Sequence, residues 1–145
     1  MNFGKLSPKK VLSGLLIVAR KPAQRQILRR ITGHVPAKRS VQVDSIDEAD
    51  IQIMKHEPDA IIIDVSDFKS GEFSVRLAPF VLSLPGWIRI FFVDQKPTPS
   101  RIARAAELGV GGVLKAPISH HGITTLLSEL GSGDSQEKGE SKDEE

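Results

Sequence analysis

The sequence predicts an α/β fold with a doubly wound parallel sheet of five strands. Three observations predict it: short apolar blocks recur five times, an amphipathic segment follows each block, and the connections between them are short. Most of the blocks are apolar on successive residues, which is typical of strands covered by helices on both faces of a sheet. A chain of 145 residues, 39% of them hydrophobic, can bury one core, so we expect a single folded domain.

Five segments are predicted to be strands because they are short and rich in β-branched or aromatic residues. They cover residues 15–18, 39–43, 60–63, 88–93 and 112–114. The second segment, RSVQV, alternates polar and apolar residues, so we place it nearer an edge of the sheet. Trp87, Phe91 and Phe92 accompany the fourth strand and are expected in the core.

Five helices are predicted between and after these strands. They cover residues 22–33, 45–58, 74–84, 98–109 and 119–130. Ser45, Thr98 and Ser119 are candidate N-caps, because a side-chain oxygen at that position accepts a hydrogen bond from the first turn. The third helix is the weakest prediction, since Pro79 lies inside it.

The two ends of the chain carry opposite charge. Residues 1–43 hold ten Lys or Arg and no acid, whereas residues 131–145 hold six acids and two lysines. The last segment has too few apolar residues to offset its ordering entropy. We therefore expect a basic N-terminal arm at 1–10, a folded domain at 11–130 and a disordered acidic tail at 131–145.

Several classes of protein are excluded by composition. The absence of cysteine rules out disulfides, thiolate metal sites and cysteine nucleophiles. The apolar runs are far shorter than the roughly 20 residues of a membrane helix, and no signal-peptide pattern opens the chain. We expect a cytoplasmic protein that does not contact a membrane.

An enzyme with this fold would bind a flavin or dinucleotide at the first strand–helix turn. That turn brings backbone amides against phosphate and favours glycine, but ARKPAQ at residues 19–24 has no glycine and loses one amide to proline. No G-x-S-x-G motif of a serine hydrolase occurs either. We therefore expect neither an enzyme nor a bound cofactor.

Three motifs occur at consistent spacings: LLIVARKP at 15–22, DAIIIDVSD at 59–67 and AAELGVGGVLKAP at 105–117. Together they resemble the receiver domain of bacterial two-component response regulators. The resemblance covers about residues 11–130 and implies the flavodoxin-like (βα)5 arrangement. It also implies a phosphoacceptor aspartate, acids that hold a divalent cation, a Ser or Thr ending the fourth strand, and a lysine before a proline.

This chain departs from that pattern at most of the supporting positions. By the resemblance, Asp64 stands at the phosphoacceptor position. Ala19 and Arg20 stand where receivers carry the acids, and Asp94 stands where they carry Ser or Thr. Ala116, directly before Pro117, stands at the lysine position, and Lys115 is displaced from that position by one residue. A displacement of one residue turns a strand side chain to the opposite face unless the backbone bulges. Because Mg²⁺ needs carboxylate ligands, we expect no metal and interpret the chain as a degenerate pseudo-receiver.

Two hypotheses describe where the Arg20 side chain lies. Its guanidinium could replace the cation and bridge Asp64 and Asp94, or it could turn to solvent beside Lys21 and Arg25. The first predicts that Arg20→Ala raises the pKa of Asp64 or Asp94.

The leading functional hypothesis is a single-domain, phosphorylation-independent protein-interaction module in a bacterial signalling pathway. Its partner would be another signalling protein met in trans, and the resemblance directs attention to residues 98–130, which could also form a homodimer. One alternative is an atypical receiver phosphorylated on Asp64 by a histidine kinase. Another is a nucleic-acid scaffold using the basic face of Arg25, Arg29 and Arg30, which we do not favour because no recognised nucleic-acid-binding motif accompanies it.

Overall fold

The computed structural model describes residues 11–139, with side chains at all of these positions except 27, 30–32 and 131–139. Strands and helices alternate throughout. The strands are β2 (Leu12–Val18), β3 (Ala37–Val43), β4 (Ala60–Asp64), β5 (Arg89–Asp94) and β6 (Gly112–Lys115). The helices are α1 (Pro22–Thr32), α2 (Ile46–Lys55), α3 (Ser70–Glu72), the π-helical turn η1 (Phe73–Leu77), α4 (Ala78–Leu82), α5 (Pro99–Glu107) and α6 (His120–Gly139).

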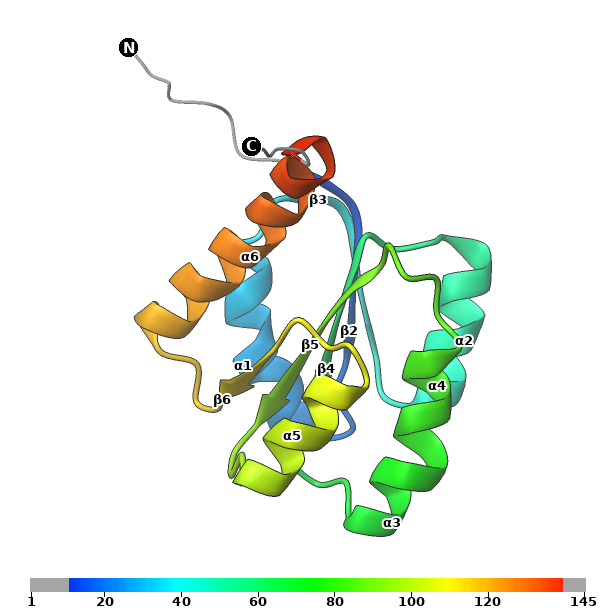
Figure 1. Cartoon of the computed structure of the whole chain (residues 1–145). Coiled ribbons are helices and arrows are strands. Elements are labelled where there is room, and N and C mark those ends of the chain that lie inside the picture. Colours follow the sequence, from blue (N-terminus) through cyan, green and yellow to red (C-terminus); the bar gives the residue numbers. More distant parts are fainter. Residues whose placement is uncertain (1–10, 140–145) are drawn as a thin grey trace.

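The five strands form one parallel sheet in the order β3-β2-β4-β5-β6 (Figure 1). This is the flavodoxin-like order, so the predicted fold class is confirmed. β3 lies at an edge, as its alternating sequence predicts, and only its last residue, Val43, is buried. β4 is buried along its whole length, including Asp64 at its end.

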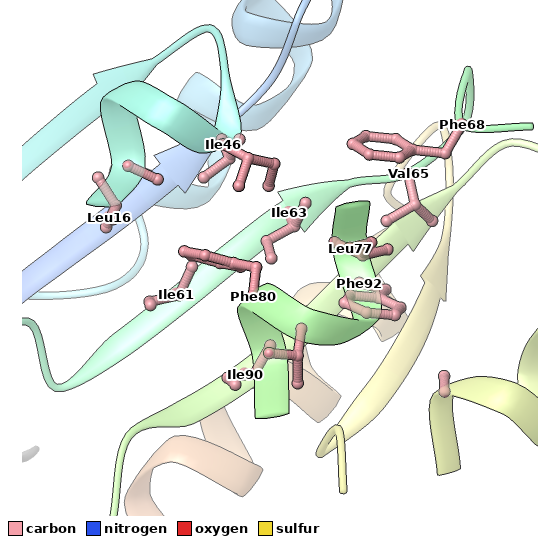
Figure 2. Packing of buried hydrophobic residues seen from close by; sticks show 14 of the residues in the cluster. Leu16, Ile46, Ile61, Ile63, Val65, Phe68, Leu77, Phe80, Ile90 and Phe92 are labelled. Carbon is pink, nitrogen blue, oxygen red and sulfur yellow. The ribbon is translucent and has the colours of Figure 1, made fainter. Parts of the chain in front are cut away.

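Helices cover both faces of the sheet and create two cores. α1 and α6 lie on one face, and α2, α4 and α5 lie on the other (Figure 1). Figure 2 shows the second core, where Ile61 and Ile63 of β4 and Ile90 of β5 lie with Leu77 and Phe80. Phe92 lies in the same cluster, and Phe91 is buried on the opposite face, as predicted. Trp87 was predicted incorrectly: it is 52% exposed because it lies in the turn before β5, outside both cores.

The predicted caps begin three of the helices. The hydroxyls of Ser45 and Thr98 accept hydrogen bonds from the amides of Glu48 and Arg101, at 3.0 and 3.2 Å. The Ser119 hydroxyl accepts one from the amide of Gly122 at 3.0 Å. These contacts fix where α2, α5 and α6 start, and hence the loops at the carboxyl edge of the sheet.

The third predicted helix is longer than expected and is interrupted. It runs from Ser70 to Leu82, and its middle turn is a π-helix in which the Ala78 amide donates to the Phe73 carbonyl, five residues earlier. Pro79 follows at once. Because proline lacks an amide and its ring crowds the carbonyl four residues before it, a wider turn at this point lets the helix continue.

The C-terminal helix differs from the sequence prediction. α6 continues to Gly139, so residues 131–139 are helical where we expected a disordered tail. Once a helix is nucleated by packed residues, each further residue adds a hydrogen bond, so a polar sequence can extend it. Residues 1–10 and 140–145, the predicted arm and the end of the tail, lie outside the described residues. Among the helices described here, none is both long and apolar enough to cross a bilayer.

Candidate functional site

The candidate site lies at the carboxyl edge of the sheet, where β4 and β5 each end in an aspartate. Asp64 is 1% exposed, and its Oδ1 accepts a hydrogen bond from the amide of Ser66 at 2.9 Å. Burial raises the pKa of Asp64, and the negative charges of Asp67 and Asp94 add to that rise, while hydrogen bonds from Ser66 oppose it. Two neighbouring carboxylates therefore disfavour any further negative charge at this carboxyl group.

Asp94 is paired with an arginine that the sequence analysis did not identify. Asp94 is 2% exposed, and Nε of Arg101 donates to its Oδ2 at 2.6 Å. Oδ1 of the same carboxylate accepts from the amide of Lys96 at 3.1 Å. The carboxylate at the predicted Ser or Thr position is thus neutralised from within the chain.

Arg101 also joins two loops. Its Nη1 donates to the carbonyl of Phe68 at 3.0 Å, and its Nη2 donates to the carbonyl of Val65 at 2.5 Å. Its guanidinium carbon lies 5.3 Å from the centre of the Phe73 ring. Because Arg101 is in the first turn of α5, one side chain holds the ends of β4 and β5 and the start of α5 together. We call this set of contacts the Arg101 clamp.

Arg20 does not bridge Asp64 and Asp94, so that prediction is wrong. Its two terminal nitrogens donate to the carboxylate oxygens of Glu72 at 3.1 and 3.4 Å, and Nη1 lies 3.8 Å from Asp67. Its guanidinium carbon lies 4.0 Å from the centre of the Phe68 ring. The alternative hypothesis, a side chain turned freely to solvent, is also wrong. The α3 helix brings Glu72 to Arg20, and Arg101 neutralises Asp94 instead.

These contacts predict a revised outcome for Arg20→Ala. Hydrogen bonding to Arg20 holds the pKa of Glu72 below its ordinary value, with the Lys69 amide contributing. The variant should raise the pKa of Glu72 toward 4.5 and leave the pKa of Asp64 unchanged, as followed by carboxyl NMR titration. Since the Glu72 pKa is depressed, this pairing stabilises the fold above pH 4.5 and is lost as the pH falls through the folded-state pKa of Glu72. A shift confined to Asp64 would contradict the assignment.

The remaining predicted pocket residues do not supply an ion-binding group. Ala19 and Ala116 are buried in the core beneath α1 and α6. β5 and β6 pair without interruption up to Asp94 and Lys115, and the amide of Ala116 donates to the carbonyl of Asp94 at 2.9 Å. With no bulge in this ladder, Lys115 is exposed between the buried Leu114 and Ala116. The Ala116–Pro117 peptide bond is cis.

One member of the predicted basic face, Arg25, is engaged within the chain. Nη1 of Arg25 donates to the carbonyls of Ala19 and Arg20, at 3.0 and 3.3 Å, and the side chain is half-buried. Arg25 therefore caps the end of β2. Arg29 is exposed, and the side chain of Arg30 lies outside the described residues.

The residues present do not fit a divalent cation. The receiver resemblance implies Mg²⁺ beside Asp64, and Mg²⁺ takes oxygen ligands in octahedral geometry. Asp94 is engaged by Arg101, and Asp67 accepts from Gln24 Nε2 at 3.4 Å and faces Arg20. Within the described part of the chain, no three His, Cys, Asp or Glu side chains are arranged to hold a metal.

Comparison with solved structures shows the receiver fold. A response regulator from Chloroflexus aurantiacus aligns with a TM-score of 0.67 at 22% identity, over 85% of this chain and 99% of that one. The chemotaxis response regulator CheY4 of Vibrio cholerae aligns with a TM-score of 0.62 at 17% identity, over 83% and 99% of the two chains. The predicted resemblance to receiver domains is confirmed at the level of the fold.

The same fold occurs in proteins described in other terms. The pilus assembly protein CpaE from Burkholderia thailandensis aligns with a TM-score of 0.67 at 15% identity, over 82% of this chain and 98% of that one. No protein-family model matches the sequence, and no curated protein matches it.

Proposed function

We propose that this protein is a pseudo-receiver: a cytoplasmic signalling module that binds another protein without being phosphorylated and catalyses no reaction. The Arg101 clamp is the observation that carries the proposal. It joins the ends of β4 and β5 to the start of α5 through one buried charge pair and two carbonyl contacts. Because these contacts hold the loops at this edge in one arrangement, the domain exposes the same surface at all times, which suits constitutive binding of a partner.

The electrostatics beside Asp64 support this proposal. A phosphoryl group on Asp64 would add negative charge near Asp67 and Asp94, which already raise the Asp64 pKa. Phosphoryl transfer relies on cations that neutralise developing charge, and the nearby arginines already hold other carboxylates. Phosphorylation of Asp64 would therefore have to disrupt contacts that stabilise the fold.

The competing hypothesis is an atypical receiver phosphorylated on Asp64, whose mass would rise when it accepts a phosphoryl group. The pseudo-receiver proposal predicts the opposite. We expect no gain in intact mass when the purified protein is incubated with acetyl phosphate and Mg²⁺. We also expect wild type and Asp64→Asn to capture the same partner from a bacterial lysate equally well. This variant keeps the Oδ1 acceptor for the Ser66 amide, so loss of folding is not anticipated. A phosphorylated wild type, or a partner captured only by a phosphorylated protein, would overturn the proposal.

The receiver fold is shared by proteins that are described in different terms. It occurs in proteins described as response regulators and in ones described as pilus assembly-related. In the predicted interaction region, residues 98–130, Ile102 is the one large apolar side chain that is exposed among the described residues, while Ala105 and Ile123 are buried. The main apolar surface of the described chain lies elsewhere.

A further inference from the structure

Exposed apolar side chains gather over α2, η1 and α4. The large hydrophobic residues exposed in this region are Ile51 (45%), Met54 (87%), Val75 (72%), Leu82 (66%) and Trp87 (52%). Only Val11 and Ile102 are exposed in this way in the rest of the described chain. Contiguous apolar surface on a soluble domain marks interaction sites, and methionine and aromatic residues are enriched at protein interfaces.

The helices that carry these residues lie side by side and run in the same direction. α2 and α4 each lead from the carboxyl end of one parallel strand to the amino end of another on the same face of the sheet (Figure 1). Arg76 of η1 lies 3.6 Å from Asp47 of α2, which sets the height of the two helices relative to each other. Ile51, one turn after Asp47, is therefore about level with Pro79 and Phe80, one turn after Arg76.

Each helix presents its apolar residues along one line. On α2, positions 47, 50, 51, 54 and 55 share an exposed face, because residues three and four apart are neighbours on a helix. On η1 and α4, positions 75, 79 and 82 have the same spacing, and all three are exposed. We call the exposed residues on these two lines, together with Trp87, the α2/α4 surface.

We propose that the α2/α4 surface is the interface of a symmetric homodimer, with each α2 packed antiparallel against α2 of a second copy. The charges of α2 favour this occupant. Asp47 and Lys55 each lie four residues from Ile51, on opposite sides of it. A two-fold axis near Ile51 places Asp47 of one copy opposite Lys55 of the other, twice by symmetry.

The same two-fold axis also brings together the exposed apolar residues of η1 and α4 from the two copies. Val75 and Leu82 lie on opposite sides of Pro79, four and three residues away. Because Pro79 is about level with Ile51, the axis brings Val75 of one copy toward Leu82 of the other. Both lines of the surface thus complement themselves in one orientation, as a two-fold interface requires. This dimer does not depend on the proposed function, and its residues lie outside the 98–130 region.

The oligomeric state of the full chain tests the proposal. We expect sedimentation velocity over a range of concentrations to show a monomer–dimer equilibrium for the wild type. Ile51→Lys places two like charges at the axis, so we expect it to weaken dimerisation by about tenfold or more. Ile102→Lys is the matched control, because both isoleucines are 45% exposed on helices and Ile102 lies outside the surface. Circular dichroism shows whether each variant is folded.

A charge exchange tests the orientation. Lys55→Asp should weaken the dimer by facing Asp47 of the second copy, and the double variant Asp47→Lys with Lys55→Asp should restore it. The exchange disturbs the Asp47–Arg76 contact in each copy, but the Asp47 side chain is 85% exposed and the Arg76 side chain 48% exposed, and such exposed pairs contribute little. A wild type that stays monomeric, equal behaviour of Ile51→Lys and Ile102→Lys, or a double variant no stronger than Lys55→Asp alone would overturn the proposal.

Discussion

Arg101→Ala is expected to lower the free energy of unfolding by about 3 kcal/mol, because it leaves Asp94 buried without its cation. Removing one partner of a fully buried pair costs about 3–5 kcal/mol, and exposed pairs contribute about 0–1 kcal/mol. Asp94 is almost fully buried, whereas the Arg101 side chain is 21% exposed, so we expect the lower end of the buried range. Urea unfolding monitored by circular dichroism measures the change.

Two further variants separate the lost ion pair from the loss of a long side chain. Arg104→Ala removes another α5 arginine, which contacts Ser74 and lies 5.2 Å from the centre of the Phe73 ring, and should cost less than about 1 kcal/mol. Adding Asp94→Ser to Arg101→Ala removes the unpaired charge and should recover part of the stability. If Arg101→Ala and Arg104→Ala have equal effects, or the double variant is no more stable than Arg101→Ala, the buried pair is not what stabilises this edge.

Phe73→Ala is expected to cost about 3–5 kcal/mol, the usual range for truncating a buried phenylalanine. Phe73 is buried at the start of the π-helical turn, and its ring packs edge-on against Phe92 with centroids 5.8 Å apart. Arg101 lies over the same ring, so the variant should also loosen the Arg101 clamp. Urea unfolding measures the loss. We expect amide hydrogen exchange to rise at residues 65–68 as well as in the helix.

Val75→Ala is the control for this prediction, because Val75 belongs to the same turn but is exposed. Measured on dilute monomer, it should change stability by no more than about 0.5 kcal/mol. Similar losses for Phe73→Ala and Val75→Ala would show that the π-helical turn itself, and not the buried ring, determines the effect.

The fold could be predicted from sequence because its signals are local and repeated. Continuous apolar blocks identified buried strands, and Ser45, Thr98 and Ser119 marked helix starts through contacts within one turn. Trp87 was misplaced because an aromatic residue beside a strand gives no information about where the turn before that strand ends. The extent of α6 was missed because composition does not show how far a nucleated helix propagates.

The candidate site was predicted only in part, for a different physical reason. Asp64 and Asp94 were identified through the receiver resemblance, and each directly follows a predicted strand, where the carboxyl ends of parallel strands meet at one edge. Which cation approaches which carboxylate depends on the loops between elements. The loop at 65–69 and the short α3 that follows it bring Glu72 to Arg20, and the first turn of α5 brings Arg101 to Asp94. Neither pairing follows a helical or strand period, so no sequence pattern indicated either one.

We infer that the chain's own charges hold the edge of the sheet around Asp64 in one state. Amide NMR spectra of the wild type, recorded while Mg²⁺ and then beryllium fluoride are added, test it most directly. Beryllium fluoride forms a phosphoryl-like group on an aspartate that can accept one. We predict that the resonances of Asp64, Asp94 and residues 98–130 stay unchanged. Shifts that begin at Asp64 and spread to residues 98–130 would contradict the account and show a working phosphorylation switch.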